Sequence, residues 1–174
     1  VERVSLKRAV TDTISLVEGA LRQHGVKCLL KVPEEASDVM VDDAQLRDVL
    51  INLILNALKA MSGGGGTIRI DVVEREVVTP GTRQNPSAMP GSYSILRVRD
   101  TGHGIKKGII DRIFEPFFTT KDVGNGSGLG LSMVYGFAKQ SKGHLTIYSE
   151  VDQGTTVRLY LPRGSKTQAL IADN

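Results

Sequence analysis

Two stretches of the chain repeat apolar residues at intervals of three and four, the spacing of a helix that buries one face. The first covers residues 5–24, with Ser5 as its predicted N-cap, Gly25 as its end, and apolar positions at Leu6, Val10, Ile14, Val17 and Leu21. The second covers residues 43–61, opens with the capping-box-like pair Asp42 and Gln45, and has its apolar face at Leu46, Val49, Leu50, Leu53, Ala57 and Met61. Glycines 63–66 end it. Further helices are predicted near 107–114 and over 129–141.

Other apolar runs alternate with polar residues or are rich in β-branched side chains, which predicts strands over residues 26–32, 67–78, 92–100, 144–150 and 155–161. The segment TPGTRQNPSAMPG holds three of the six prolines and predicts an exposed loop between the second and third strands. Strands and helices do not alternate strictly, as they would in a doubly wound sheet. The order predicts an α/β fold with a mixed sheet and helices on one face.

Length, charge and cysteine content exclude several classes of protein. A length of 174 residues predicts one compact domain, and 22 Lys+Arg against 19 Asp+Glu excludes the dense basic surface of an obligate nucleic-acid-binding protein. No apolar run approaches the roughly 20 residues of a membrane span, so we expect no membrane contact by this chain. The single cysteine, Cys28, and the lack of a signal-peptide pattern favour the cytoplasm. The first residue, Val1, indicates a fragment of a longer protein.

Three polar residues interrupt the second predicted helix at helical spacing. Asn52, Asn56 and Lys59 lie within a wedge of about 60° beside the apolar face, although asparagine is a mediocre helix former. They could form an ordinary solvated face. Alternatively, a neutral amide oxygen can bind Mg²⁺ and a lysine can meet a phosphate.

Glycine is concentrated in two motifs of the second half. DTGHGI, residues 100–105, follows a predicted strand, and GSGLGL, residues 126–131, opens a predicted helix. Asp and Gly favour turns in any protein, so the first motif could be only a strand-ending turn. It could also present a carboxylate to a ligand, and glycine-rich backbone entering a helix can bind an anion.

Taken in order, these motifs resemble the ATP-binding catalytic domain of sensor histidine kinases, within the wider superfamily that includes gyrase B, MutL and the heat-shock chaperone ATPases. The matching motifs are LINLILNALKAM, DTGHGI, FEPFFTTK and GSGLGLSMV, and the resemblance extends from about residue 42 to residue 162. Among histidine kinases, the sequence FEPFFTTK and the short glycine run after the second helix are most similar to the nitrogen-regulatory type. The resemblance implies a two-layer α/β sandwich, the Bergerat fold, with ATP and Mg²⁺ as cofactors. The catalytic domain is expected over 1–162. After it, RGSKTQ is typical of a polar linker, and ALIADN resembles the first strand of a receiver domain, so 163–174 is expected to be a linker or the start of a further domain; a frayed tail is the alternative.

The resemblance also implies a role for individual residues. Asn56 would bind Mg²⁺, Asn52 would support the same polar wall, and Lys59 would contact phosphate; these three form the expected catalytic set. Asp100 would accept a hydrogen bond from the adenine amino group, helped by a water shared with Thr155. The remaining expected nucleotide contacts are Gly102, Gly104, Ile105, Phe117, Thr119, Thr120, Lys121, Gly126, Ser127, Gly128, Leu129, Gly130 and Leu131. Residues 118–127 would form a mobile lid.

One departure within the superfamily bears on the reaction. Gyrase-type members carry a glutamate that activates water at the position of Asn52. An amide cannot take that proton, so hydrolysis is disfavoured and the γ-phosphoryl group is kept for another acceptor. His24, His103 and His144 do not lie in a phosphoacceptor motif, so the acceptor histidine is expected on a separate dimerisation hairpin of the same parent, with a response regulator receiver domain as the downstream partner. A regulatory ATP-binding module and an anti-sigma-type serine kinase are the alternatives.

Overall fold

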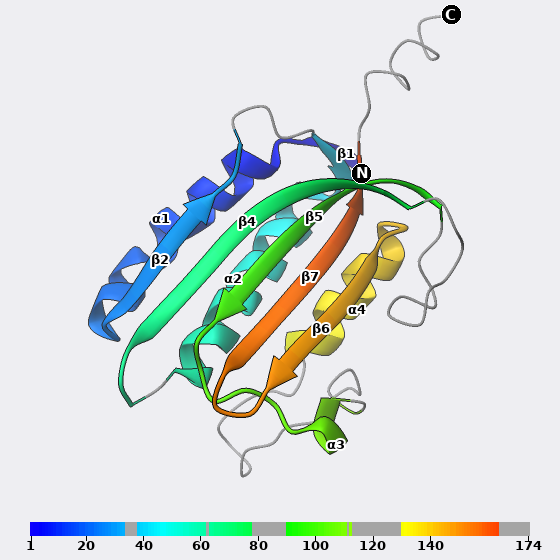
Figure 1. The fold of residues 1–174 in the computed structure, drawn as a ribbon. Helices are drawn as coiled ribbons and strands as arrows, with labels where there is room; N and C mark the ends of the chain where they lie inside the picture. Colours follow the sequence, from blue (N-terminus) through cyan, green and yellow to red (C-terminus); the bar gives the residue numbers. More distant parts are fainter. Residues whose placement is uncertain (34–37, 62, 78–89, 111, 113–129, 164–174) are drawn as a thin grey trace, which may run out of the picture.

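A five-stranded sheet forms one layer of the molecule (Figure 1). The computed structural model describes residues 1–33, 38–61, 63–77, 90–110, 112 and 130–163. The strands are arranged in the order β2 (Val26–Lys31), β4 (Gly66–Val77), β5 (Gly91–Asp100), β7 (Gly154–Pro162) and β6 (His144–Glu150). Only β2 and β4 pair in parallel within this sheet, and the other three pairings are antiparallel. The predicted mixed sheet is therefore confirmed.

Three helices cover one face of the sheet as a second layer: α1 (Leu6–Gln23), α2 (Asp43–Ala60) and α4 (Gly130–Gln140) (Figure 1). Large apolar side chains from both layers are almost completely buried between them, among them Leu6, Leu46, Leu50, Ile54, Ile68, Ile70, Leu96 and Leu159. Burying this apolar surface is the main force that holds the two layers together. The expected two-layer α/β sandwich is confirmed.

The helix boundaries follow from local chemistry. Ser5 Oγ accepts a hydrogen bond from the backbone N–H of Arg8 at 3.3 Å, and Asp42 Oδ1 accepts one from Gln45 at 3.0 Å. These bonds satisfy donors that the first helical turn leaves unpaired. Gly25, with φ of +67°, turns the chain out of α1 in a conformation that side-chain-bearing residues rarely adopt. Both predicted caps and the predicted stop are confirmed.

Two short strands were not predicted. β1 (Glu2–Val4) and β3 (Val39–Val41) form a separate antiparallel pair, and Val39 also bridges to Arg163 just after β7. The start of the chain, β3 and the end of β7 therefore lie together at one end of the domain (Figure 1). The predicted helix near 107–114 is described only as α3 (Lys107–Ile110). The proline-containing loop falls mostly outside the described residues.

Candidate functional site

The candidate site lies at the opposite end of the sheet, where β5 ends at Asp100 and β7 begins at Gly154. Asp100 and Thr155 are neighbours there, because Arg99 pairs with Thr156 in the antiparallel ladder. Asp100 Oδ1 accepts two backbone hydrogen bonds, from Gly102 at 2.9 Å and from Thr155 at 3.3 Å. The predicted partners Asp100 and Thr155 are thus brought together by strand pairing.

Asp100 is buried, and the hydrogen bonds that its carboxylate accepts from described residues all go to one oxygen, Oδ1. The residue is 8% exposed, and burial raises the pKa of its carboxyl although the two backbone N–H groups oppose the rise. Among the described residues, none donates a hydrogen bond to Oδ2. Oδ2 is not one of the described buried side-chain atoms that lack a hydrogen-bond partner, which are Thr13 Oγ1, Ser94 Oγ and Thr146 Oγ1. An ionised carboxylate oxygen only accepts hydrogen bonds, so Oδ2 is suited to an N–H group of a ligand.

The loop after Asp100 is wedged between α2 and β6, which explains two of its glycines. A Cβ atom at Gly102 would lie 2.5 Å from the carbonyl oxygen of Ala60, at the end of α2. Gly104 has φ of +73°, and a Cβ atom there would overlap the carbonyl oxygen of Glu150. At both positions the space that a Cβ atom would need is already filled by protein backbone. Their contact with a nucleotide stays a prediction.

The polar wedge of α2 faces the start of α4. Asn52 Nδ2 donates to the carbonyl oxygen of Asp48 at 3.0 Å and lies 4.0 Å from Met133 Sδ of α4. A Cβ atom at Gly130, the first residue of α4, would be 3.2 Å from Asn56 Nδ2. Asn56 is half-buried and forms no side-chain hydrogen bond with a described residue. Within the described part of the chain, the Asn56 amide thus lies at the α2–α4 contact without a hydrogen-bond partner.

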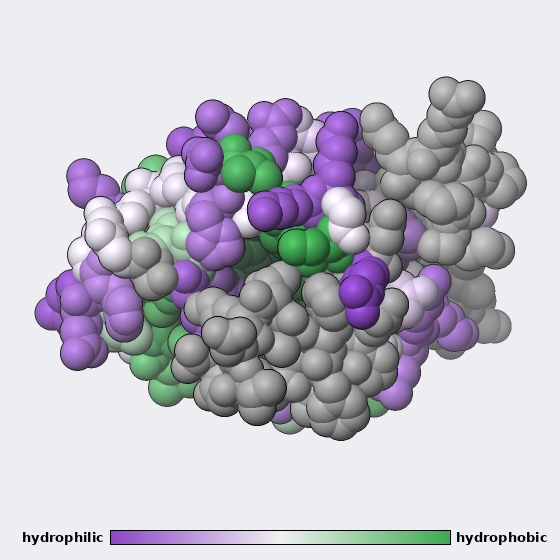
Figure 2. Space-filling model, turned by 90° about the horizontal axis from the view of Figure 1, so that it is seen from below, coloured by the Kyte–Doolittle hydropathy of each residue, from purple (hydrophilic) through white to green (hydrophobic). Residues whose placement is uncertain are grey.

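Lys59 is exposed one turn further along α2, and the next residue, Ala60, accepts a hydrogen bond from His103 N at 2.9 Å. The end of α2 thus meets the loop that carries the predicted nucleotide contacts. Figure 2 views the molecule from this end and shows apolar residues near the centre, with hydrophilic residues above and to the right of them. The structure gathers the α2 wedge, the Asp100 loop and the start of α4 at one end of the sheet.

Several predicted contacts lie outside the described residues: Phe117, Thr119, Thr120, Lys121, Gly126, Ser127, Gly128 and Leu129. Gly130 and Leu131 are described as the first residues of α4. Sequence reasoning missed Ser149 of β6, whose hydroxyl accepts a hydrogen bond from Ile105 N at 2.7 Å. A serine near the end of a strand carries no signal of its own, so only the folded structure connects it to the site.

Comparison with known proteins assigns this arrangement to a family. Residues 41–165 match the family described as histidine kinase-, DNA gyrase B- and HSP90-like ATPases. The chain belongs to this ATPase family. All four motifs noted in the sequence fall inside the matched region, so their family resemblance is confirmed. ATP binding, typically with Mg²⁺, is a property of this ATPase family.

Relatives of this ATPase family member include sensor kinases. The chain is 45% identical over 127 residues to the sensor kinase CckA of Brucella abortus, covering 72% of this chain and 13% of that protein. It is 34% identical over 161 residues to the two-component sensor PprA of Pseudomonas aeruginosa, covering 92% of this chain and 16% of that protein. The chain thus spans a small part of these curated relatives.

A solved structure supports the same ATPase fold. The catalytic domain of the histidine kinase ThkA has a TM-score of 0.73 and 24% sequence identity, covering 92% of this chain and 96% of that domain. The likeness confirms the fold. Among the described residues, none of the helices combines the length and apolar composition needed to cross a bilayer.

Proposed function

We propose that this chain binds ATP with Mg²⁺ and transfers the γ-phosphoryl group to a histidine on a separate dimerisation hairpin of the same parent protein. The observation that carries the proposal is the buried carboxylate of Asp100, whose Oδ2 accepts no hydrogen bond from a described residue, in a member of an ATPase family. In its ionised form the carboxylate only accepts hydrogen bonds. It therefore fits the exocyclic amino group of adenine, which donates them.

The wedge on α2 supplies groups suited to the metal and the phosphates. Asn56 offers an amide oxygen that binds Mg²⁺ without adding charge, and its side chain has no hydrogen-bond partner among the described residues. Lys59 is exposed at the same end of the domain and would meet a phosphate as a positive charge. Bound Mg²⁺ would neutralise charge on the triphosphate. Residues 126–131 would surround the phosphates with backbone N–H groups.

Asn52 supports transfer over hydrolysis. Its amide Nδ2 already donates to the carbonyl oxygen of Asp48, and an amide cannot take a proton from an attacking water. Without a general base at this position, the hydrolysis of ATP is slow. The γ-phosphoryl group then remains available for a histidine acceptor.

The whole protein would act in two-component signalling. A response regulator receiver domain would accept the phosphoryl group from the hairpin, and the reaction would take place in the cytoplasm. Residues 1–162 would form the catalytic unit, and residues 163–174 would lead into a linker or a receiver-like domain. The sensor kinases among the relatives support the role in two-component signalling.

Transfer of radiolabel from ATP tests the proposal. Three reactions contain the chain alone, the chain with the hairpin, and the chain with a hairpin whose acceptor His is changed to Gln. We expect acid-labile phosphate on the unmodified hairpin alone, and weak labelling, because separate pieces lack the roughly millimolar effective concentration that a tether gives. Strong labelling of the chain itself contradicts the proposal. ATP binding without labelling of any component favours a regulatory module instead.

A further inference from the structure

The hydroxyl of Ser149 is the centre of a buried hydrogen-bond cluster next to Asp100. Ser149 is 8% exposed, and its Oγ lies 2.7 Å from Ile105 N, 2.8 Å from Thr155 Oγ1 and 3.1 Å from the carbonyl oxygen of Gly154. These three partners come from the loop after β5 and from the start of β7. Ser149 therefore links the two segments that flank Asp100.

The number of available protons determines which group donates and which accepts in each hydrogen bond of the cluster. Ile105 N–H can only donate, and the Gly154 carbonyl can only accept. Ser149 has one hydroxyl proton, so all three contacts are hydrogen bonds only if that proton goes to Gly154. Thr155 must then donate its own proton to Ser149 Oγ. The Thr155 oxygen is left with lone pairs alone for any other partner.

We infer that Ser149 is a positioning residue that holds the Thr155 hydroxyl as an acceptor, so that the site selects a 6-amino purine over a 6-oxo purine. The inference rests on the proposed ATP site. Thr155 N also donates to Asp100 Oδ1, which keeps this residue beside the carboxylate. In the proposed site, the Asp100 carboxylate and the Thr155 hydroxyl would then both act as acceptors toward the base.

A pair of acceptors discriminates between purines by simple complementarity. The 6-amino group of adenine donates, whereas the 6-oxo group of hypoxanthine presents lone pairs to lone pairs. A water between Asp100 and Thr155 gives the same result, since it donates to both residues and has only its own lone pairs left for the base. Rotation of the Thr155 hydroxyl would remove this selectivity, and the bond to Ser149 prevents that rotation.

Calorimetric titration with ATP and ITP tests the inference, because ITP has a 6-oxo group and an identical triphosphate. In the Ser149→Ala variant the Thr155 proton is free to turn toward the base. One hydrogen bond is worth about 1 kcal/mol, so we expect the ATP-to-ITP affinity ratio to fall about 3- to 10-fold. A purely structural role would weaken both nucleotides equally. That equal loss would overturn the inference.

A double-mutant cycle with Thr155→Val tests whether Ser149 changes the nucleotide selectivity through the Thr155 hydroxyl. If Ser149 acts through Thr155, Thr155→Val lowers the ATP-to-ITP affinity ratio by itself, and Ser149→Ala leaves that ratio unchanged in the Thr155→Val background. An unaltered ratio in Thr155→Val overturns the inference even if Ser149→Ala does not fold. Failure of the unmodified chain to bind ATP would instead refute the proposed function.

Discussion

Asp100 is held where its charge is disfavoured. Burial raises the pKa of its carboxyl, so the folded state binds a proton more tightly than the unfolded chain does. Stability therefore falls as pH rises through the interval between the ordinary and the raised pKa. The proposed ATP site needs the ionised form as an acceptor. Binding and stability thus place opposite demands on this one side chain.

The Asp100→Asn variant separates these demands. Asn Oδ1 can keep the bonds from Gly102 and Thr155 while Nδ2 presents a donor to the adenine amino group. We expect a loss of about 10- to 100-fold in ATP affinity, a much smaller change for GTP, and a Tm at neutral pH equal to or above that of the unmodified chain. The Tm difference should shrink as pH falls. Parallel losses for ATP and GTP, or a Tm advantage that grows in acid, would contradict this account.

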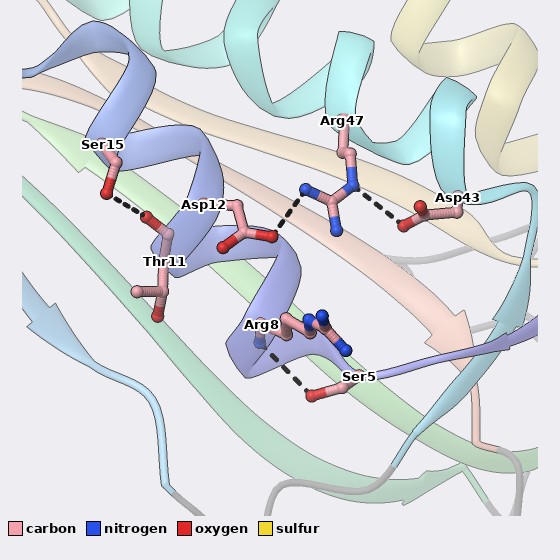
Figure 3. Close-up of polar contacts among 7 residues, drawn as sticks. All are labelled: Ser5, Arg8, Thr11, Asp12, Ser15, Asp43 and Arg47. Atoms are coloured by element: carbon pink, nitrogen blue, oxygen red, sulfur yellow. Dashed lines mark hydrogen bonds and ion pairs between the residues drawn. The ribbon is translucent and has the colours of Figure 1, made fainter.

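At the scale of elements, Arg47 joins α1 to α2 near the start of the helix that carries the polar wedge. Its guanidinium contacts Asp12 of α1 at 2.9 Å and Asp43 of α2 at 3.0 Å (Figure 3). These side chains are 30–48% exposed, so each pair is partly screened by solvent. The link ties α2 to the N-terminal helix as well as to the sheet.

Replacing Arg47 by Met keeps the apolar stem and removes both ion pairs. We expect the free energy of unfolding to fall by about 0.5–1 kcal/mol at low salt and by less at high salt. Arg22→Met is the matched control, because the Arg22–Glu18 pair is long at 3.9 Å and both side chains are highly exposed. Denaturant titration measures both variants. Equal effects of the two substitutions would show that Arg47 does not couple the helices.

Elements could be predicted from the sequence where contacts between residues close in the chain define them. Ser5 and Asp42 cap helices because their side chains reach a backbone donor three residues later, which the sequence displays directly. β1 and β3 have three residues each and depend on pairing with each other, so no periodic pattern reveals them. Ser149 was missed for the same reason, since its partners are 44 and 6 residues away.

At the scale of the whole molecule, the start of the chain and the end of β7 lie at one end of the sheet, and the proposed ATP site lies at the other. β7 runs from Gly154, beside Asp100, to Pro162, and Arg163 then bridges to Val39 of β3. Nine residues of extended chain span about 30 Å. The mixed sheet could be predicted from element order, but the parallel pairing of β2 with β4 could not, because it joins residues about 40 positions apart in the sequence, such as Val26 and Gly66.

Binding of ATP with and without Mg²⁺ to the unmodified chain and to Asn56→Ala tests the central claim most directly. Asn56 is the proposed metal ligand, so removing its amide should weaken ATP with Mg²⁺ by about 10- to 100-fold and change ADP without metal little. Isothermal titration calorimetry gives both affinities, and ADP without metal is the internal control. A selective loss with Mg²⁺ supports a metal–ATP site at the α2–α4 contact. Equal losses in both conditions, or unmodified chain that binds no ATP, would contradict it.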